Sequence, residues 1–277
     1  MQTLRDSAFL AVMDAPHTLS IRTCGLARTF TTPRGPVDAV RGIDLAVRQG
    51  EILGFLGPNG AGKTTTLRML TTLLAPTGGT ATIAGHDLAR DPAGVRRRIG
   101  YVAQSGGVDP TVSVREELVT QGRFYRLRTP DAQARAEELA AELGLDGLLE
   151  RPCGALSGGQ RRRLDIAMAL THRPEILFLD EPTTGLDPGS RADLWDLVRR
   201  IRSAWGTTVF LTTHYLDEAD ALADRLVVVD KGAVAAEGTP AELKTRHAGS
   251  PTATLQDAFL AITGRGAAAR DAAPLAV

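Results

Sequence analysis

The chain has 277 residues, of which 43% are hydrophobic and 23% charged, as in an ordinary globular protein that needs no disulfides to stabilise its core. Its 32 basic and 32 acidic residues give a formal net charge of zero, which argues against a protein that binds nucleic acid over its whole surface. Cys24 and Cys153 lie far apart in the sequence, so a disulfide framework and a paired-cysteine metal site are excluded and a reducing compartment is indicated.

The first residues of the chain do not have the pattern of a membrane-spanning or secretory segment. The apolar stretch at 7–13 is much shorter than the roughly 20 residues of a spanning helix, and no small-residue cleavage site follows it. We interpret it as a frayed terminus and expect a cytoplasmic protein. Residues 19–56 then alternate short apolar runs with turn signals such as Thr32-Pro33-Arg34-Gly35, which predicts antiparallel strands.

A glycine-rich turn separates a buried strand predicted at 51–56 from a helix predicted at 63–74. The turn matches the P-loop pattern, in which glycines let successive backbone N–H groups face a phosphate at a helix N-terminus. In this pattern Lys63 supplies positive charge for the β- and γ-phosphates of a nucleotide, and the hydroxyl of Thr64 ligates Mg²⁺. The predicted ATP-binding residues are Gly57, Pro58, Asn59, Gly60, Ala61, Gly62, Lys63, Thr64 and Thr65.

The segment 105–150 has a helical composition. Ser113 and Glu116 have the spacing of a capping box, which predicts the start of a helix. A second helix is predicted with Thr129 as its N-cap, Pro130 as its first residue and Gly144 as its end. We therefore expect an all-helical insert within an α/β protein.

The pentapeptide Leu156-Ser157-Gly158-Gly159-Gln160 opens a helix predicted to run to about Thr171. Ser157 suits an N-cap, and the glycines after it leave backbone N–H groups at a positive helix end that suits an anion. In isolation, a capped helix without a ligand explains this pentapeptide better. We interpret the arginine runs at 96–98 and 161–163 as solvated helix faces, since the zero net charge and the absence of interleaved aromatics disfavour nucleic-acid binding.

Two carboxylates lie at the end of the apolar strand predicted at 175–180: Asp180 is its last residue, and Glu181 follows it. We expect Asp180 to hold Mg²⁺ through a water and Glu181 to act as the base for an attacking water. A second buried strand at 207–213, after a helix at 191–204, predicts a mainly parallel sheet covered by helices on both faces. His214 follows that strand, where its imidazole can hydrogen-bond a γ-phosphate. We interpret the other histidines as surface residues: His17, His86, His172 and His247.

The C-terminal part of the chain is predicted to hold a hairpin and a short helix. Apolar runs at 226–229 and 233–236 flank a glycine turn, which is typical of a β-hairpin. Within 251–277, Leu255, Phe259 and Ile262 share one face of an amphipathic helix, and the alanine-rich tail after it is expected to be disordered.

The P-loop, the pentapeptide LSGGQ and the strand ending in Asp-Glu, in this order, resemble the ATP-binding cassette (ABC) ATPases. The resemblance covers about 19–246 and depends mainly on GPNGAGKTT combined with LSGGQ. It implies an α/β fold in which a P-loop NTPase core carries an N-terminal antiparallel β subdomain and an α-helical subdomain. We expect an ATPase domain at 19–250, with the nucleotide-binding core at 19–104 and 151–250 and the helical subdomain at 105–150.

The resemblance also implies roles for residues whose local context leaves their function open. Gln104 stands at the entry to the helical subdomain, Asp187 lies in a loop that contacts the opposite P-loop, and Phe30 stacks on adenine, where tyrosine is more usual. The family's LSGGQ motif, here Leu156, Ser157, Gly158, Gly159 and Gln160, acts on the nucleotide of the opposite subunit. The expected catalytic residues are Lys63, Glu181 and His214, and the expected Mg²⁺ ligands are Thr64, Gln104 and Asp180.

In this family, ATP is held between two cassettes, so the chain is expected to pair with a second copy or a homologue. A single cassette without a membrane segment resembles the ATPase subunit of a transporter whose permease is a separate chain on the inner face of the membrane. The stretches 213–219 and 255–265 are similar to daunorubicin-type resistance ATPases, which implies export of a drug-like or other hydrophobic substrate. A soluble regulatory ATPase and a catalytically weak partner in a heterodimer remain as alternatives, whereas a small-molecule kinase would have no use for LSGGQ.

Overall fold

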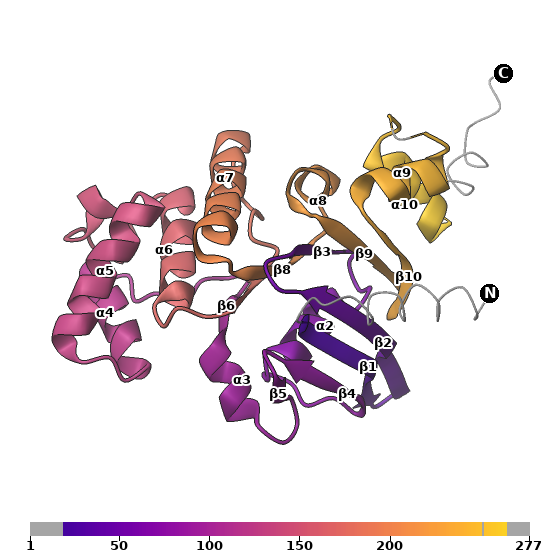
Figure 1. Cartoon of the computed structure of the whole chain (residues 1–277), viewed down its shortest axis with the longest axis horizontal. Helices are drawn as coiled ribbons and strands as arrows, with labels where there is room; N and C mark the ends of the chain where they lie inside the picture. Colours follow the sequence, from indigo (N-terminus) through magenta and orange to yellow (C-terminus); the bar gives the residue numbers. More distant parts are fainter. Residues whose placement is uncertain (1–18, 251, 265–277) are drawn as a thin grey trace.

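Two β-sheets organise the chain in the computed structural model, which describes residues 19–250 and 252–264 (Figure 1). The predicted frayed N-terminus and disordered tail lie outside the described residues. The smaller sheet has four antiparallel strands in the order β2-β1-β4-β5. Its strands are β1 (Leu19–Thr32), β2 (Gly35–Arg48), β4 (Gly78–Ile83) and β5 (His86–Asp87).

The larger sheet has six strands in the order β10-β9-β3-β8-β7-β6, and only the pairing of β9 with β10 is antiparallel. Every residue of β3, β7 and β8 is buried, as expected for parallel strands covered on both faces. The predicted fold class is therefore confirmed. The strands are β3 (Ile52–Leu56), β6 (Ile99–Val102), β7 (Ile176–Asp180), β8 (Thr208–Thr213), β9 (Arg225–Asp230) and β10 (Ala233–Gly238).

Helices cover both faces of the larger sheet (Figure 1). Helix α2 packs between the two sheets, whereas α4 to α7 pack on the opposite face. The alternation of side chains along β7 produces two separate hydrophobic clusters. Ile176 and Phe178 face the cluster that contains α2, whereas Leu177 and Leu179 face the cluster that contains α4 to α7. The helices are α2 (Lys63–Leu70), α3 (Pro92–Arg98), α4 (Val114–Phe124), α5 (Thr129–Leu143), α6 (Gly158–Leu170), α7 (Pro188–Trp205), α8 (Leu216–Leu222), α9 (Pro240–Ala248) and α10 (Leu255–Thr263), with 3₁₀ turns at Asp146–Leu148 and Cys153–Ala155.

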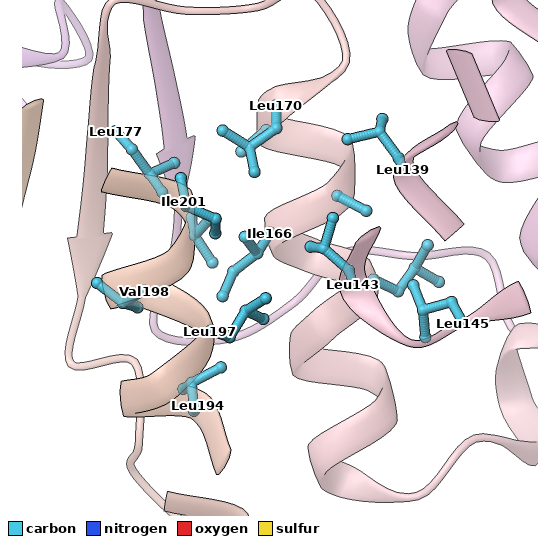
Figure 2. Close-up of a cluster of buried hydrophobic side chains, with 14 of the residues drawn as sticks. Leu139, Leu143, Leu145, Ile166, Leu170, Leu177, Leu194, Leu197, Val198 and Ile201 are labelled. Carbon is cyan, nitrogen blue, oxygen red and sulfur yellow. The ribbon is translucent and has the colours of Figure 1, made fainter. Parts of the chain in front are cut away.

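The helices between β6 and β7 pack as one cluster against the parallel sheet. In Figure 2, Leu177 of β7 meets apolar side chains from α5, α6 and α7: Leu139, Leu143, Ile166, Leu170, Leu194, Leu197, Val198 and Ile201. Their mutual burial fixes where the N-terminus of α6 lies relative to the sheet. The division into a core and a helical subdomain at 105–150 stays a prediction.

Most of the predicted helix ends are found, and three differ. Helix α7 begins at Pro188 rather than at 191, because Asp187 caps it. The capping box of Ser113 and Glu116 at α4 is confirmed. Helix α5 begins with Thr129 itself and has Arg128 as its N-cap, so the predicted cap was wrong by one residue. Helix α2 ends at Leu70 rather than at 74, because Thr72 adopts a left-handed conformation with φ of 63° that no α-helix continues through.

The predicted amphipathic helix at the C-terminal side is α10. Its Leu255 is buried in a small cluster with residues of α8, α9 and β9, and Phe259 and Ile262 pack against that cluster. Among residues 19–250 and 252–264, no helix combines the length and the apolar character required to cross a bilayer.

His172 is not the surface residue that we predicted. Its ring stacks on Tyr125 at a centroid distance of 3.7 Å, its Nε2 lies 2.9 Å from the carbonyl oxygen of Ile99, and its Nδ1 is buried without a partner. Burial lowers the pKa of His172 from its ordinary value of 6.5 to about 4, because a second N–H on the ring would have no acceptor. His86 is also half-buried, with Nδ1 2.8 Å from the carboxylate of Asp91.

The neutral state of His172 makes the stability of the fold depend on pH. The unfolded chain takes up this proton near pH 6.5 and the folded chain only near pH 4, so folding stability is lost as the pH falls through that window. The His172→Phe variant keeps a ring on Tyr125 but has no proton to gain. We expect it to lose less stability than the wild type between pH 6.5 and 4.5 in urea unfolding; parallel losses would contradict this assignment.

Candidate nucleotide site

The P-loop connects the end of β3 to the first residue of α2. Gly60 and Gly62 adopt left-handed φ values of 79° and 100°, which glycine tolerates at no steric cost. Gly57 has no room for a side chain, since a Cβ there would lie 2.5 Å from the carbonyl oxygen of Val229. Gly62 is the N-cap of α2 without a side-chain cap, so the first N–H groups of the helix remain available to an anion.

Lys63 lies inside the curl of this loop with only 5% of its surface exposed. Its Nζ donates to the carbonyl oxygens of Gly57 at 2.9 Å and Pro58 at 3.3 Å. It also lies 3.4 Å from Oε1 of Glu181. The ammonium group is thus held at the point where the helix N-terminus and the end of β7 meet.

Asp180 ends β7 with its carboxylate turned toward the P-loop. Its Oδ1 accepts from the hydroxyls of Thr212 at 2.6 Å and Thr64 at 3.4 Å. Burial raises the pKa of Asp180 above its ordinary value, although both hydroxyls act in the opposite direction. A threonine hydroxyl and a carboxylate oxygen this close are the hard oxygen donors that Mg²⁺ takes, so these residues fit the ion. Thr212, which our sequence analysis missed, orients this carboxylate.

Glu181 is the residue on which the other predicted site residues converge. Its backbone has a left-handed φ of 46°, and its N–H donates to the carbonyl oxygen of Thr212 at 3.0 Å. The Nε2 of Gln104 donates to its Oε2 at 3.1 Å, and Nδ1 of His214 lies 3.1 Å from its Oε1. The side chain of Glu181 is only 9% exposed, and that of Lys63 beside it only 5%. An acceptor that is held among three such groups can take a proton from a water molecule beside the P-loop.

The LSGGQ pentapeptide lies elsewhere in the molecule. Ser157 and Gln160 form a capping box at the start of α6, as the N-cap prediction required. Among the described residues, no hydrogen bond or ion pair joins 156–160 to 57–65. In Figure 1, α6 lies beside α4 and α5, away from α2. The free N–H groups of this helix end therefore face a ligand held by another molecule or none.

Asp187 and Phe30 also lie apart from the carboxylate cluster. Asp187 is the exposed N-cap of α7, where bonds from the N–H and hydroxyl of Ser190 lower its pKa. Phe30 is a half-buried residue of β1 with the guanidinium of Arg28 4.7 Å above its ring. Their expected contacts, with an opposite P-loop and with adenine, remain predictions.

Arg162 corrects our interpretation of the arginine run at 161–163 as a solvated face. It is 6% exposed, and its guanidinium donates to the carbonyl oxygens of Ala103, Asp180 and Pro182. The sequence contained a sign of this burial, because Arg162, Ile166 and Leu170 follow one another at intervals of four residues. Arg162 therefore shares the buried face of α6.

Comparisons with known proteins agree with this geometry. The family model described as ABC transporter matches residues 40–184. The daunorubicin/doxorubicin resistance ATP-binding protein of Streptomyces peucetius is 51% identical over 233 residues, covering 84% of this chain and 69% of the relative. The doxorubicin resistance ATP-binding protein of Mycobacterium tuberculosis is 47% identical over 222 residues, covering 80% of this chain and 66% of the relative.

Solved structures show the same fold. A dimer of the ATP-binding cassette MJ0796, in a post-hydrolysis state with ADP and phosphate, has a TM-score of 0.72 at 26% identity and covers 79% of this chain and 98% of its own. The cbiO1 protein of Clostridium perfringens, part of the transporter complex cbiONQ, has a TM-score of 0.72 at 27% identity, with 81% and 90% covered.

The fold and the convergence of Lys63, Asp180 and Glu181 define a P-loop ATPase. The chain belongs to the ABC transporter family, as an ATP-binding subunit that hydrolyses ATP and is homologous to the ATPases of drug-resistance exporters.

Proposed function

We propose that the chain powers the export of a drug-like hydrophobic substrate through a separate permease, by hydrolysing ATP at a site shared between two cassettes. The main support for this proposal is the cluster beside the P-loop in which Glu181 meets Lys63, Gln104 and His214. The LSGGQ segment lies on a different part of the molecule. The resistance ATPases at 51% and 47% identity support the type of substrate.

Hydrolysis requires a water, a base and stabilised charge on the γ-phosphate. The N–H groups at the start of α2 and the ammonium of Lys63 bind the phosphate oxygens. Glu181 accepts a proton as the water oxygen bonds to the γ-phosphorus and the bond to the β-phosphate oxygen breaks. Gln104 holds the carboxylate through its hydrogen bond, and His214, beside the same carboxylate, senses the γ-phosphate. Thr64, Asp180 and Gln104 would hold Mg²⁺, which neutralises charge on the β- and γ-oxygens.

The second half of the site comes from a partner cassette. The N-terminus of α6, with Ser157 and the two glycines, donates to the γ-phosphate held by the opposite P-loop, and Asp187 contacts that P-loop. Phe30 stacks on adenine. Because each chain carries one P-loop and one LSGGQ, two chains complete two sites, and ATP joins them. The dimeric cassette with ADP and phosphate supports this arrangement as a homologue.

A groove beside Gln104 is the proposed contact with the permease. It begins at residues 105–107, directly after Gln104, and lies between the end of α2 and helices α4 and α6. Its floor and rim combine apolar Leu73, Tyr125 and Met168 with polar Arg96 and Gln121. Leu73 is 54% exposed, which suits a surface that a partner covers. Docking here places the chain on the cytoplasmic face of the membrane.

Transport by inverted membrane vesicles tests this function. We use inverted vesicles from cells that produce this chain together with its permease. When ATP is added outside, we expect the vesicles to take up daunorubicin, which is measured by the quenching of its fluorescence. The wild type should drive uptake, as should Glu142→Gln, a control on the exposed face of α5, whereas Glu181→Gln should not. ATP hydrolysis without uptake would reject the substrate class, and uptake that survives Glu181→Gln would reject the catalytic assignment.

A further inference from the structure

The guanidinium of Arg162 joins three segments that carry the hydrolytic residues. Its Nη1 donates to the carbonyl oxygen of Ala103 at 2.6 Å, directly before Gln104. Its Nη2 donates to the carbonyl oxygen of Asp180 at 3.2 Å and its Nε to that of Pro182 at 2.8 Å, on the two sides of Glu181. A single side chain from α6 thus fixes the backbone on both sides of Glu181. It also fixes the backbone next to Gln104, whose amide donates to Glu181.

The neighbouring arginines do not share this arrangement. Arg161 donates to the carbonyl oxygens of Cys153 and Gly154, within the turn that precedes α6. Arg163 is paired with Asp193 of α7 at 3.2 Å and donates to the carbonyl oxygen of Leu143, at the end of α5, at 3.5 Å. Of the run, only Arg162 is buried. The run therefore offers a matched control for a test of Arg162.

The chemistry of the contact requires arginine. The planar guanidinium presents five N–H donors in fixed directions, so it can bond three carbonyl oxygens at once, whereas a lysine ammonium is a single point on a flexible stem. Its charge is compensated by Asp165, one turn along α6, with Nη1 and Oδ2 3.6 Å apart and both side chains at most 11% exposed. Burying a charged guanidinium carries a desolvation penalty that an apolar side chain of similar volume would avoid, so filling space does not account for an arginine here.

We propose that Arg162 is a positioning residue for ATP hydrolysis, which ties the helix that starts with LSGGQ to the Glu181 turn and to the Gln104 segment of the same chain. This inference rests on the proposed function, in which Glu181 is the base. Glu181 has a left-handed backbone, a conformation that is unfavourable for this residue type and must be maintained by its surroundings. The bonds from Arg162 to its two neighbours supply that restraint.

One consequence concerns the two sites of the dimer. The N-terminus of α6 donates to the nucleotide of the opposite cassette, while Arg162 in the next turn of the same helix holds the base of its own site. A shift of α6 on closure therefore reaches Gln104 and Glu181 through these three hydrogen bonds.

The test compares Arg162→Lys and Arg162→Gln with Arg163→Gln in the purified full chain with Mg-ATP. We expect kcat to fall by roughly 10- to 100-fold in Arg162→Gln and by less in Arg162→Lys, because a misplacement of about 1 Å can cost 10²-fold. The Kd for a fluorescent ATP analogue should stay within about two-fold of the wild type, since the P-loop is untouched. Arg163→Gln should retain the wild-type kcat.

The kcat, the Kd and the melting temperature of Arg162→Lys together distinguish a positioning role from a structural one. A loss of kcat with retained Kd and melting temperature in Arg162→Lys supports positioning. A kcat of Arg162→Lys within two-fold of wild type overturns it, and so does a parallel loss of kcat, nucleotide binding and melting temperature, which marks a structural role only. If Arg162→Gln fails to fold, Arg162→Lys decides alone. Wild-type turnover in Glu181→Gln would instead reject the proposed function itself.

Discussion

The Glu181→Gln variant is expected to lose about 10²- to 10⁴-fold of kcat, the usual contribution of a positioned general base. Glutamine has nearly the same shape as glutamate and can keep a bond with the Nε2 of Gln104, now 3.1 Å from Oε2. It cannot accept a proton from water at neutral pH. The effect should therefore fall on the chemical step and leave the P-loop, with its ammonium and helix N-terminus, able to bind ATP.

The slow step has a second observable consequence. With hydrolysis blocked, the nucleotide that joins two cassettes persists, so we expect Glu181→Gln to form a dimer with Mg-ATP in light scattering and a monomer without it. Glu142→Gln serves as the control, because Glu142 is exposed on α5 and far from the site in sequence. A Glu181→Gln protein that hydrolyses ATP at the wild-type rate, or remains monomeric with Mg-ATP, would contradict the shared-site mechanism.

The Lys63→Ala variant is expected to bind ATP at least roughly 10- to 100-fold more weakly, since a hydrogen bond to a charged group contributes about 1.5–3 kcal/mol. Lys63 is held by the carbonyl oxygens of Gly57 and Pro58, so its ammonium is already aimed along the loop. Alanine keeps the helix but removes the ammonium group beside Glu181. Among the described lysines and arginines, Lys63 is the only one that forms an ion pair with Glu181.

Titration of the fluorescent ATP analogue into Lys63→Ala measures this loss directly. Lys244→Ala is the matched control, because Lys244 of α9 pairs with Asp220 of α8, away from the P-loop. Micromolar binding that survives in Lys63→Ala would argue against the phosphate contact. An equal loss in Lys244→Ala would indicate that the variants unfold rather than lose a ligand contact.

Local patterns in the sequence were sufficient where an interaction spans a few residues. The capping box predicted at Ser113 and the N-cap predicted at Ser157 each join residues three apart, so local residue types are enough to specify them. The P-loop is equally local, because its glycine conformations and the start of α2 follow from residues 57–64. The alternation of strands and helices was enough to predict the parallel sheet, since only that arrangement buries continuous apolar strands on both faces.

Sequence motifs alone were enough to predict the class of the protein, the nucleotide loop and the two carboxylates at the end of β7. The groups that meet Glu181 and Asp180 follow from the folding of distant segments against one another. Gln104 lies 77 residues from Glu181, and Thr212 lies 32 residues from Asp180. These contacts form because neighbouring parallel strands end at the same edge of the sheet, which no local pattern records. The packing of α6 likewise buries Arg162 and leaves Arg163 half-buried beside Asp193, since burial depends on what a helix face meets rather than on the residue type.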